Sequence, residues 1–220
     1  VLNGDDPNVV RLADSATHAQ VHYFGVDENE MSMKVSNEAS EGKFCFRCNA
    51  ELKYDYYQYS HIGRFHCPNC SFGHNEFYLE AHEVDIANQT FVVDGMQFHA
   101  PQDALYAIYN CVGVISLAKL ENMDLAIARD VLKTFELKDG RMEHFDIGKD
   151  CLLNLVKNPT GANEVMKYIM RDKEAKDIVI VLNDNDQEGT DVSWIWDAHF
   201  DLLVNDTTKN IICSGLRAYD

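Results

Sequence analysis

The chain has 220 residues, of which 46% are hydrophobic and 25% charged, and its formal net charge is −17. This length suits one or two domains with a sizeable core. The acidic balance disfavours binding to a nucleic-acid backbone, which requires basic side chains that displace counterions. No apolar run approaches the about 20 residues of a membrane span, and no signal peptide opens the sequence. We therefore expect a cytoplasmic protein.

Residues 1–29 predict an αβ unit. A strand end at 1–3 leads into the acidic turn "GDDP", a short helix follows, and "AQVHYFGV" (19–26) reads as a second strand. The sequence begins at Val1 without a Met and stops at "SGLRAYD". These ends lead us to expect a segment of a longer polypeptide.

Four of the seven cysteines cluster between residues 42 and 75. Cys45 and Cys48 form one Cys-x2-Cys pair, eighteen residues follow, and Cys67 and Cys70 form the second pair. This spacing is typical of a zinc ribbon, in which two such turns close a tetrahedral site of four thiolates. Because sulfur would occupy all four positions, the zinc would be structural. The tyrosine-rich stretch between the pairs predicts a short antiparallel hairpin.

Two disulfides are the alternative for these four cysteines, but an unexported chain sits in a reducing compartment, which favours zinc. His66 and His74 flank the pairs and are interpreted as neighbours of the site or surface residues. Cys111, Cys151 and Cys213 lie in apolar sequence surroundings and are interpreted as small core residues.

After the ribbon, residues 77–100 alternate apolar and polar side chains and break at "ANQ" and "DG", which predicts a β-meander. Residues 101–120 carry apolar side chains at spacings of three and four, which predicts a long and mostly buried helix. A second helix is predicted at 122–135, with Asp124 in its first turn. A turn leading into a strand follows.

A domain boundary is predicted near Ile147, because strand–loop–helix units start again there. Strands alternating with helices predict a parallel sheet whose functional loops lie at the carboxyl ends of the strands. The loops "KNPTGAN" (157–163) and "NDNDQEGTD" (183–191) would then lie side by side. The second loop follows the β-branched run "DIVIVL" (177–182).

The segment 183–197, "NDNDQEGTDVSWIWD", holds five acidic residues and both tryptophans of the chain. A calcium loop, a helix cap beside packed aromatic residues, and an acidic catalytic site are the three interpretations. Four positions match ligand and turn positions of an EF-hand loop: Asp184, Asp186, Glu188 and Gly189. The last position of that loop should be Glu but is Ile195, and a strand enters the loop instead of a helix. We therefore reject calcium.

The order of these pieces resembles the Mur ligases and folylpolyglutamate synthases, which are ATP-dependent amide-forming enzymes. The matching stretches are "VLNGDDP" (1–7), "ALYAIYNCVGVISLA" (104–118), "DGRMEHF" (139–145) and "NLVKNP" (154–159). The sequence departs from the family where Ala104 and Ala107 replace Gly and Asn. Asn154 also replaces the Asp that meets the ATP ribose in this family.

The ribbon together with "NDNDQEGTDVSWIWDAHFD" resembles the MurT family, whose members are synthetase subunits of bacterial lipid II isoglutaminyl synthases. The resemblance implies an α/β fold in which residues 1–146 are the C-terminal part of a Mur ligase middle (ATPase) domain. The ribbon at about 42–75 would be inserted in that domain. Residues 147–220 would be the N-terminal part of the C-terminal α/β domain. The phosphate-binding glycine loop of the family does not occur in this sequence.

The resemblance implies that ATP, with Mg²⁺, activates the α-carboxylate of D-glutamate in the stem peptide of lipid II. Ammonia from a GatD-like class I glutamine amidotransferase, the partner in a heterodimer, then gives D-isoglutamine at the cytoplasmic face of the membrane. Asn110 would contact adenine and Arg141 the terminal phosphate. From the residues alone, Asn110 could be a polar helix residue and Arg141 an ordinary turn residue.

Asp191 has two interpretations. It could cap a helical turn that begins at Val192, with Trp194 and Trp196 as packing anchors. In the MurT interpretation it reaches the partner's catalytic His, and the tryptophans stiffen the loop or line the interface. We favour the catalytic role, with Asp197 as the second candidate.

Two other functions are considered. A Mur-type ligase would use the same activation but accept an amino acid, and a non-enzymatic module would use the ribbon only to bind a protein. Mur ligases generally lack the ribbon and "DVSWIWD", which favours the amidating subunit.

Overall fold

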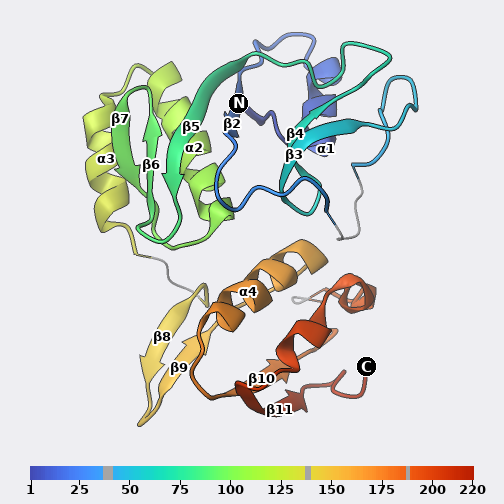
Figure 1. Cartoon of the computed structure of the whole chain (residues 1–220), viewed down its shortest axis with the longest axis vertical. Helices are drawn as coiled ribbons and strands as arrows, with labels where there is room; N and C mark the ends of the chain where they lie inside the picture. The colour runs from blue at the N-terminus through green and yellow to red at the C-terminus, as the bar shows by residue number, and fades with distance from the viewer. Residues whose placement is uncertain (37–41, 137–139, 187–188) are drawn as a thin grey trace. The chain divides into compact units, whose positions relative to one another are not determined.

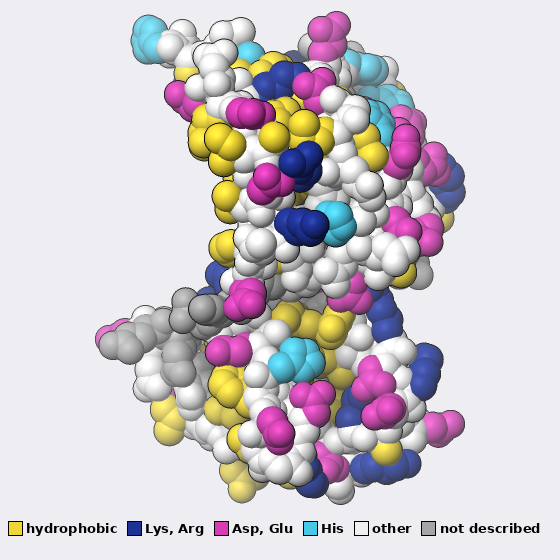
Figure 2. All heavy atoms as spheres, turned by 90° about the vertical axis from the view of Figure 1, so that its left-hand side faces the viewer, with side chains coloured by type: hydrophobic (Ala, Val, Ile, Leu, Met, Phe, Trp, Pro, Cys, Tyr) yellow, Lys and Arg dark blue, Asp and Glu magenta, His cyan; other side chains and the backbone are white. Residues whose placement is uncertain are grey.

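The computed structural model describes residues 1–36, 42–136, 140–186 and 189–220. The chain folds into two compact units, Val1–Glu136 and Leu137–Asp220, and each has a hydrophobic core of its own. Within the described ranges, no helix is both long and apolar enough to cross a membrane. Acidic side chains are spread over the face seen in Figure 2 and do not gather in one patch, in keeping with the net charge of −17.

A five-stranded sheet in the order β1-β2-β5-β6-β7 forms the centre of the first unit (Figure 1). Its strands are β1 (Leu2–Asn3), β2 (Tyr23–Val26), β5 (Phe77–Asp85), β6 (Thr90–Val93) and β7 (Met96–His99). β1, β2 and β5 are parallel, and β5, β6 and β7 form the predicted antiparallel meander. The short helix α1 (Pro7–Val10) and the 3₁₀ turn η1 (Arg11–Ser15) connect β1 to β2, as expected for an αβ unit.

The predicted long helix is α2 (Leu105–Leu120), and it packs against β1, β2 and β5. Most of its residues that face the sheet are buried, and Ile108, Val112 and Ile115 join Phe91 and Phe98 in one core. The second helix, α3 (Leu125–Thr134), packs against α2 and β7.

The stretch between the cysteine pairs forms the predicted antiparallel hairpin, β3 (Lys53–Tyr59) and β4 (Ile62–His66). This hairpin is embedded in the first unit. Gln58 is 3% exposed and Phe65 is 1% exposed. Ile62 belongs to the core of the sheet and α2, whereas Phe65 packs with Cys45 and Cys67 in a second cluster.

In its described residues, the second unit contains two separate two-stranded sheets and one long helix. Its elements are β8 (Glu143–Asp146), β9 (Asp150–Leu153), α4 (Pro159–Arg171), β10 (Lys176–Val181), the 3₁₀ turns η2 (Ser193–Asp197) and η3 (Phe200–Leu203), and β11 (Thr208–Ser214). Asn158 caps α4, because its side chain accepts the N–H of Gly161 at 2.7 Å.

The pairing in this unit differs from the predicted single parallel sheet. β10 is parallel to β11, but β9 pairs antiparallel with β8. Gly148, at φ +86°, turns the chain back between β8 and β9, so one edge of β9 pairs within its own hairpin. The loops 157–163 and 183–191 therefore do not follow neighbouring strands of one sheet.

The unit boundary precedes the position predicted near Ile147. Ile147 lies in the turn of the β8–β9 hairpin, and its N–H donates to the carbonyl of Lys149 at 3.2 Å. The compact units divide between Glu136 and Leu137, and the boundary between family domains near Ile147 stays a prediction. Part of the turn predicted before β8 (137–139) lies outside the described residues.

Asp124 gives a test of the helix assignment. It is the N-cap of α3, and its Oδ1 accepts the N–H of Ala126 at 2.9 Å. We expect Asp124→Ala to lower the free energy of unfolding by about 1 kcal/mol, because a helix N–H loses its partner. Asp124→Asn keeps an acceptor and is the control. Urea titration of both variants measures this, and equal stability of the two would contradict the assignment.

Candidate functional site

The four clustered cysteines converge on one point in the structure. Their sulfur atoms all lie within 4.8 Å of one another. Across the two pairs, the Sγ atoms of Cys45 and Cys70 are 3.6 Å apart and those of Cys48 and Cys67 are 3.4 Å apart. A tetrahedral zinc site with Zn–S bonds of about 2.3 Å requires sulfurs about 3.8 Å apart, whereas a disulfide requires about 2.05 Å. The geometry fits a four-thiolate metal site, and all four cysteines are free thiols.

Backbone hydrogen bonds fix the turn around each cysteine pair, so that both thiols of a pair can face one metal ion. The N–H of Cys45 donates to the carbonyl of Ala50 at 2.7 Å, and the N–H of Cys67 donates to the carbonyl of Phe72 at 2.8 Å. Burial raises the pKa of Cys67, but hydrogen bonds from the Asn69 N–H and the neighbouring thiols lower it by more, to about 7. Backbone hydrogen bonds lower the pKa values of Cys48 and Cys70, but thiol–thiol hydrogen bonds and burial leave both raised. A thiol that ionises near neutral pH suits a metal ligand.

The other histidines and cysteines named by the sequence occupy different roles. The rings of His66 and His74 are 5.4 Å apart, and His74 Nε2 lies 3.2 Å from the carbonyl of Cys67. They are neighbours of the thiols, as interpreted. Cys111 is buried as predicted, but the predictions for Cys151 and Cys213 were wrong, because both are exposed on strands of thin two-stranded sheets.

The two candidate nucleotide contacts are both exposed. Asn110 lies on α2 in the first unit, directly after the buried Tyr109. Arg141 lies just before β8 in the second unit. Asn154, which follows β9, accepts the N–H of Met142 at 3.4 Å, so it ties the two ends of this hairpin together.

Asp191 is exposed and lies just before the aromatic turn, the segment Ser193–Asp197 that contains both tryptophans. Its Oδ1 accepts the N–H of Ser193 at 2.9 Å, and hydrogen bonds from Ser193 lower the pKa of Asp191. The 3₁₀ turn η2 begins at Ser193, one residue later than predicted, so Asp191 stands one place before the capping position at Val192. Gly189 turns the backbone at φ +97°. Asp191 is therefore not the N-cap of η2, and its carboxylate is exposed although it accepts the Ser193 N–H.

One acidic residue of the loop has a structural partner that the sequence analysis missed. Arg217, close to the end of the chain, places its Nη1 3.0 Å from Asp184 and its Nε 2.6 Å from Asp220. The loop that leaves β10 is thereby tied to the segment that leaves β11. Because β10 and β11 are parallel neighbours, both segments emerge at the same edge. Only the strand pairing brings these residues together.

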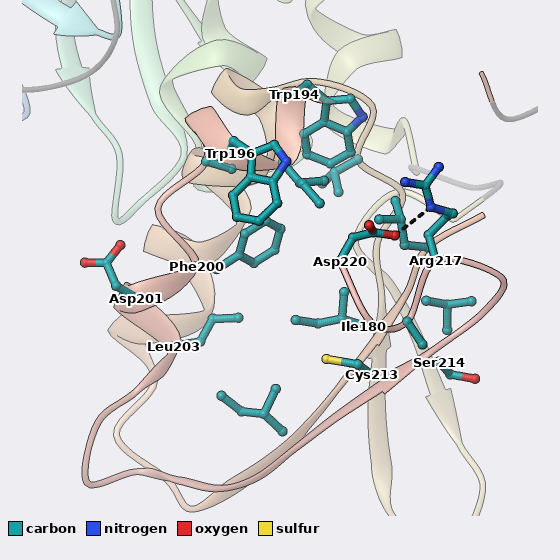
Figure 3. A pocket seen from close by; sticks show the side chains of 17 residues that line it. Ile180, Trp194, Trp196, Phe200, Asp201, Leu203, Cys213, Ser214, Arg217 and Asp220 are labelled. Atoms are coloured by element: carbon teal, nitrogen blue, oxygen red, sulfur yellow. Dashed lines mark hydrogen bonds and ion pairs between the residues drawn. The ribbon is translucent and has the colours of Figure 1, made fainter. Parts of the chain in front are cut away.

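A pocket of about 460 Å³ lies between the β10–β11 sheet and the two turns η2 and η3, which carry Trp194, Trp196 and Phe200 and are called the aromatic turns below (Figure 3). Trp194, Trp196 and Phe200 form one side and Ile180 lies on the sheet side, while Arg217 and Asp220 form a charged pair at its edge. Trp196 is 76% exposed, whereas Trp194 packs with α4 and β10 in the core of this unit. The two tryptophans therefore differ in role. Trp194 holds the turn against the core of this unit, and Trp196 exposes its ring to solvent.

Comparison of structures defines the fold class. The chain is similar to a pseudomurein peptide ligase type C from Methanothermus fervidus, with a TM-score of 0.65 and 23% sequence identity. The match covers 86% of this chain and 37% of that protein. The fold is therefore α/β, as predicted, and similar to the fold of this peptide ligase.

Comparison of sequences identifies the relatives more closely. Residues 155–220 match the family described as MurT ligase C-terminal. The chain is 29% identical to the MurT subunits of lipid II isoglutaminyl synthase (glutamine-hydrolyzing) from Streptococcus pneumoniae R6 and Staphylococcus aureus COL. Each match covers 99% of the chain and 49% of the relative, so the chain spans about half the length of these relatives. The predicted resemblance to MurT is confirmed.

The cysteine cluster leads to a direct prediction. Purified protein should contain about one zinc ion per chain, and Cys67→Ser should lose this metal and unfold at lower temperature, because metal binding contributes folding free energy. Cys151→Ser replaces an exposed cysteine outside the cluster and should keep both. Elemental analysis and thermal denaturation measure the two effects. A well-folded wild type without bound metal would contradict the assignment.

Proposed function

We propose that this chain is part of the synthetase subunit of a lipid II isoglutaminyl synthase. The observation that carries the proposal is the similarity to MurT subunits over 99% of the chain. The Mur-ligase-like fold supports the same class of reaction. The subunit would act at the cytoplasmic face of the membrane, where its lipid-linked substrate is made.

The proposed reaction has two steps. First, an oxygen of the D-glutamate α-carboxylate attacks the γ-phosphorus of Mg²⁺-bound ATP, which forms an acyl phosphate and releases ADP. Ammonia then attacks the acyl carbon, phosphate leaves, and the amide of D-isoglutamine remains after loss of a proton. A carboxylate requires this activation because its own oxygen is a poor leaving group. The two candidate contacts to ATP are Asn110 at adenine and Arg141 at the terminal phosphate, where a guanidinium suits the transferred charge.

Zinc has no part in these steps. Cys45, Cys48, Cys67 and Cys70 would hold it with four thiolates, which leaves no coordination position for water or substrate. Bound zinc would close the two cysteine turns and the hairpin between them into one folded element. Its role in the proposal is to stabilise the first unit.

Ammonia would come from a partner subunit, a GatD-like class I glutamine amidotransferase. Such enzymes use a Cys nucleophile and a His base, and a carboxylate orients the His. We propose that Asp191 supplies this carboxylate across the interface. The side chain is exposed and so accessible to a partner. Trp196, with its exposed ring beside the pocket, would lie in the same interface, since aromatic residues are enriched there.

A second candidate function is a Mur-type ligase that joins an amino acid to the activated carboxylate. The similarity of the fold to a peptide ligase favours it. The two functions share the activation of a carboxylate by ATP and differ in the nucleophile that attacks the acyl phosphate.

The nucleophile provides the test of the proposed function. The full-length protein, mixed with its partner amidotransferase, should convert lipid II to the D-isoglutamine form only when ATP and either glutamine or free ammonia are present. Mass spectrometry detects the product, because replacing a hydroxyl by an amine lowers the mass by about one dalton. Incorporation of an amino acid without the partner would instead establish the Mur-type ligase.

Asp191 is tested separately in the assembled complex. Asp191→Asn should leave assembly and the hydrogen bond with Ser193 intact, because Asn still accepts the Ser193 N–H, yet lower glutamine hydrolysis at least about a hundredfold. Amidation with free ammonia should persist. Asp186→Asn, an exposed carboxylate of the same loop, is the control and should hydrolyse glutamine normally.

Full glutamine hydrolysis by Asp191→Asn would refute the catalytic role and leave the residue with only its hydrogen bond with Ser193. Loss of hydrolysis in Asp197→Asn instead would transfer the role to that exposed residue.

A further inference from the structure

Arg64 links the zinc-ribbon hairpin to the interior of the first unit. It lies on β4, between the two cysteine pairs, and its side chain is 25% exposed. Its Nε donates to Asp5 Oδ1 at 3.2 Å, and its Nη2 donates to Glu80 on β5. Its guanidinium also lies 4.2 Å from the centre of the Phe77 ring. One side chain of the ribbon thus contacts the segment after β1 and the strand β5.

Asp5 links Arg64 to α2 through a hydrogen bond with Tyr109. The residue is fully buried, and its Oδ2 accepts the Tyr109 hydroxyl and the Val26 N–H, each at 2.9 Å. Burial raises the pKa of Tyr109 well above its ordinary value, so its hydroxyl keeps the proton that it donates. Gly63, the residue before Arg64, also donates its N–H to the Asp5 carbonyl at 2.9 Å.

A second contact joins the same two elements. The ring of Tyr59, at the end of β3, packs edge-on against Tyr109 with ring centroids 5.9 Å apart. Tyr109 is 3% exposed, and the next residue along the helix is the exposed Asn110. The ribbon hairpin therefore contacts α2 at Tyr109, the residue next to the proposed adenine contact Asn110.

We propose that Arg64 is a positioning residue for nucleotide binding: through Asp5 and Tyr109 it fixes the turn of α2 that presents Asn110. This inference rests on the proposed function. A buried carboxylate accepts well-aligned donors only in one arrangement, so a shift of Arg64 moves the partners of Asp5 and, with them, Tyr109. The ribbon then acts on the nucleotide site without touching the nucleotide.

The test measures equilibrium binding of a non-hydrolysable ATP analogue with Mg²⁺ to the full-length protein by calorimetry. Tyr109→Phe removes one hydroxyl, keeps the ring, and should weaken binding about fivefold to tenfold, a coupling typical of linked sites. Arg64→Met should weaken binding at least as much, and Arg64→Lys should restore part of the loss. Zinc content is measured for each variant and should stay at the wild-type value.

Two controls separate positioning from general destabilisation. Arg47→Met removes another arginine of the ribbon, whose ion pair with Asp14 is more exposed, and should bind the analogue as wild type does. Phe98→Leu lowers stability in the same core without touching the network. It should also bind normally at a temperature where it remains folded.

The outcomes distinguish the inference from the proposed function. Weaker binding confined to the Tyr109 and Arg64 variants supports the positioning role, and binding equal to wild type in Tyr109→Phe overturns it. Equal weakening in Phe98→Leu also overturns it, since stability alone would then account for the effect. A wild-type protein that binds no ATP analogue overturns the proposed nucleotide site and the positioning role with it.

Discussion

The buried carboxylate of Asp5 is the interaction on which the first unit depends. Burial raises the pKa of this group, and Arg64, the Val26 N–H and the Tyr109 hydroxyl oppose that shift. A buried charge that loses its partner costs about 3 to 5 kcal/mol, so these donors cannot be rearranged independently. Strand β2, helix α2 and the ribbon hairpin each supply one of them. The sheet, the helix and the insertion are therefore packed around a single acidic side chain.

This arrangement explains why the ribbon is an integral part of the fold. Its hairpin contributes Ile62 to the core of the sheet and Phe65 to the cluster around the thiols. A four-thiolate metal would hold one end of the hairpin, and Asp5 holds the other through Arg64 and the Gly63 N–H. The hairpin is constrained at both ends, so the state of the cysteine cluster can influence the sheet and α2.

The second unit follows a different principle. As far as the structure describes it, the β10–β11 sheet has two parallel strands, and such a pair cannot cover its own faces. Helix α4 and the aromatic turns cover one side, where Trp194 packs with Met166 and Leu203. The buried Asn163 of α4 accepts the His199 N–H at 2.8 Å and so holds the aromatic turns in place. Asp191 therefore precedes a turn that is held by packing and by a hydrogen bond to α4, which would suit the proposed contact of its carboxylate with a partner subunit.

The sequence by itself determined what depends on neighbouring residues: the cysteine spacing, the hairpin between the pairs, the meander and the helix α2 all follow from local periodicity and turn residues. It could not determine pairings between distant segments. Asp5 and Arg64 are 59 positions apart, and β9 pairs with β8 instead of joining β10, because alternating strands and helices do not specify which strands exchange hydrogen bonds. The exposure of individual cysteines also depends on which distant segments pack over them. Cys151 and Cys213 have apolar neighbours in sequence but are exposed on two-stranded sheets, and Cys213 lines the open pocket beside the aromatic turns. Only the tertiary structure, which satisfies buried charges and strand edges together, decided these features.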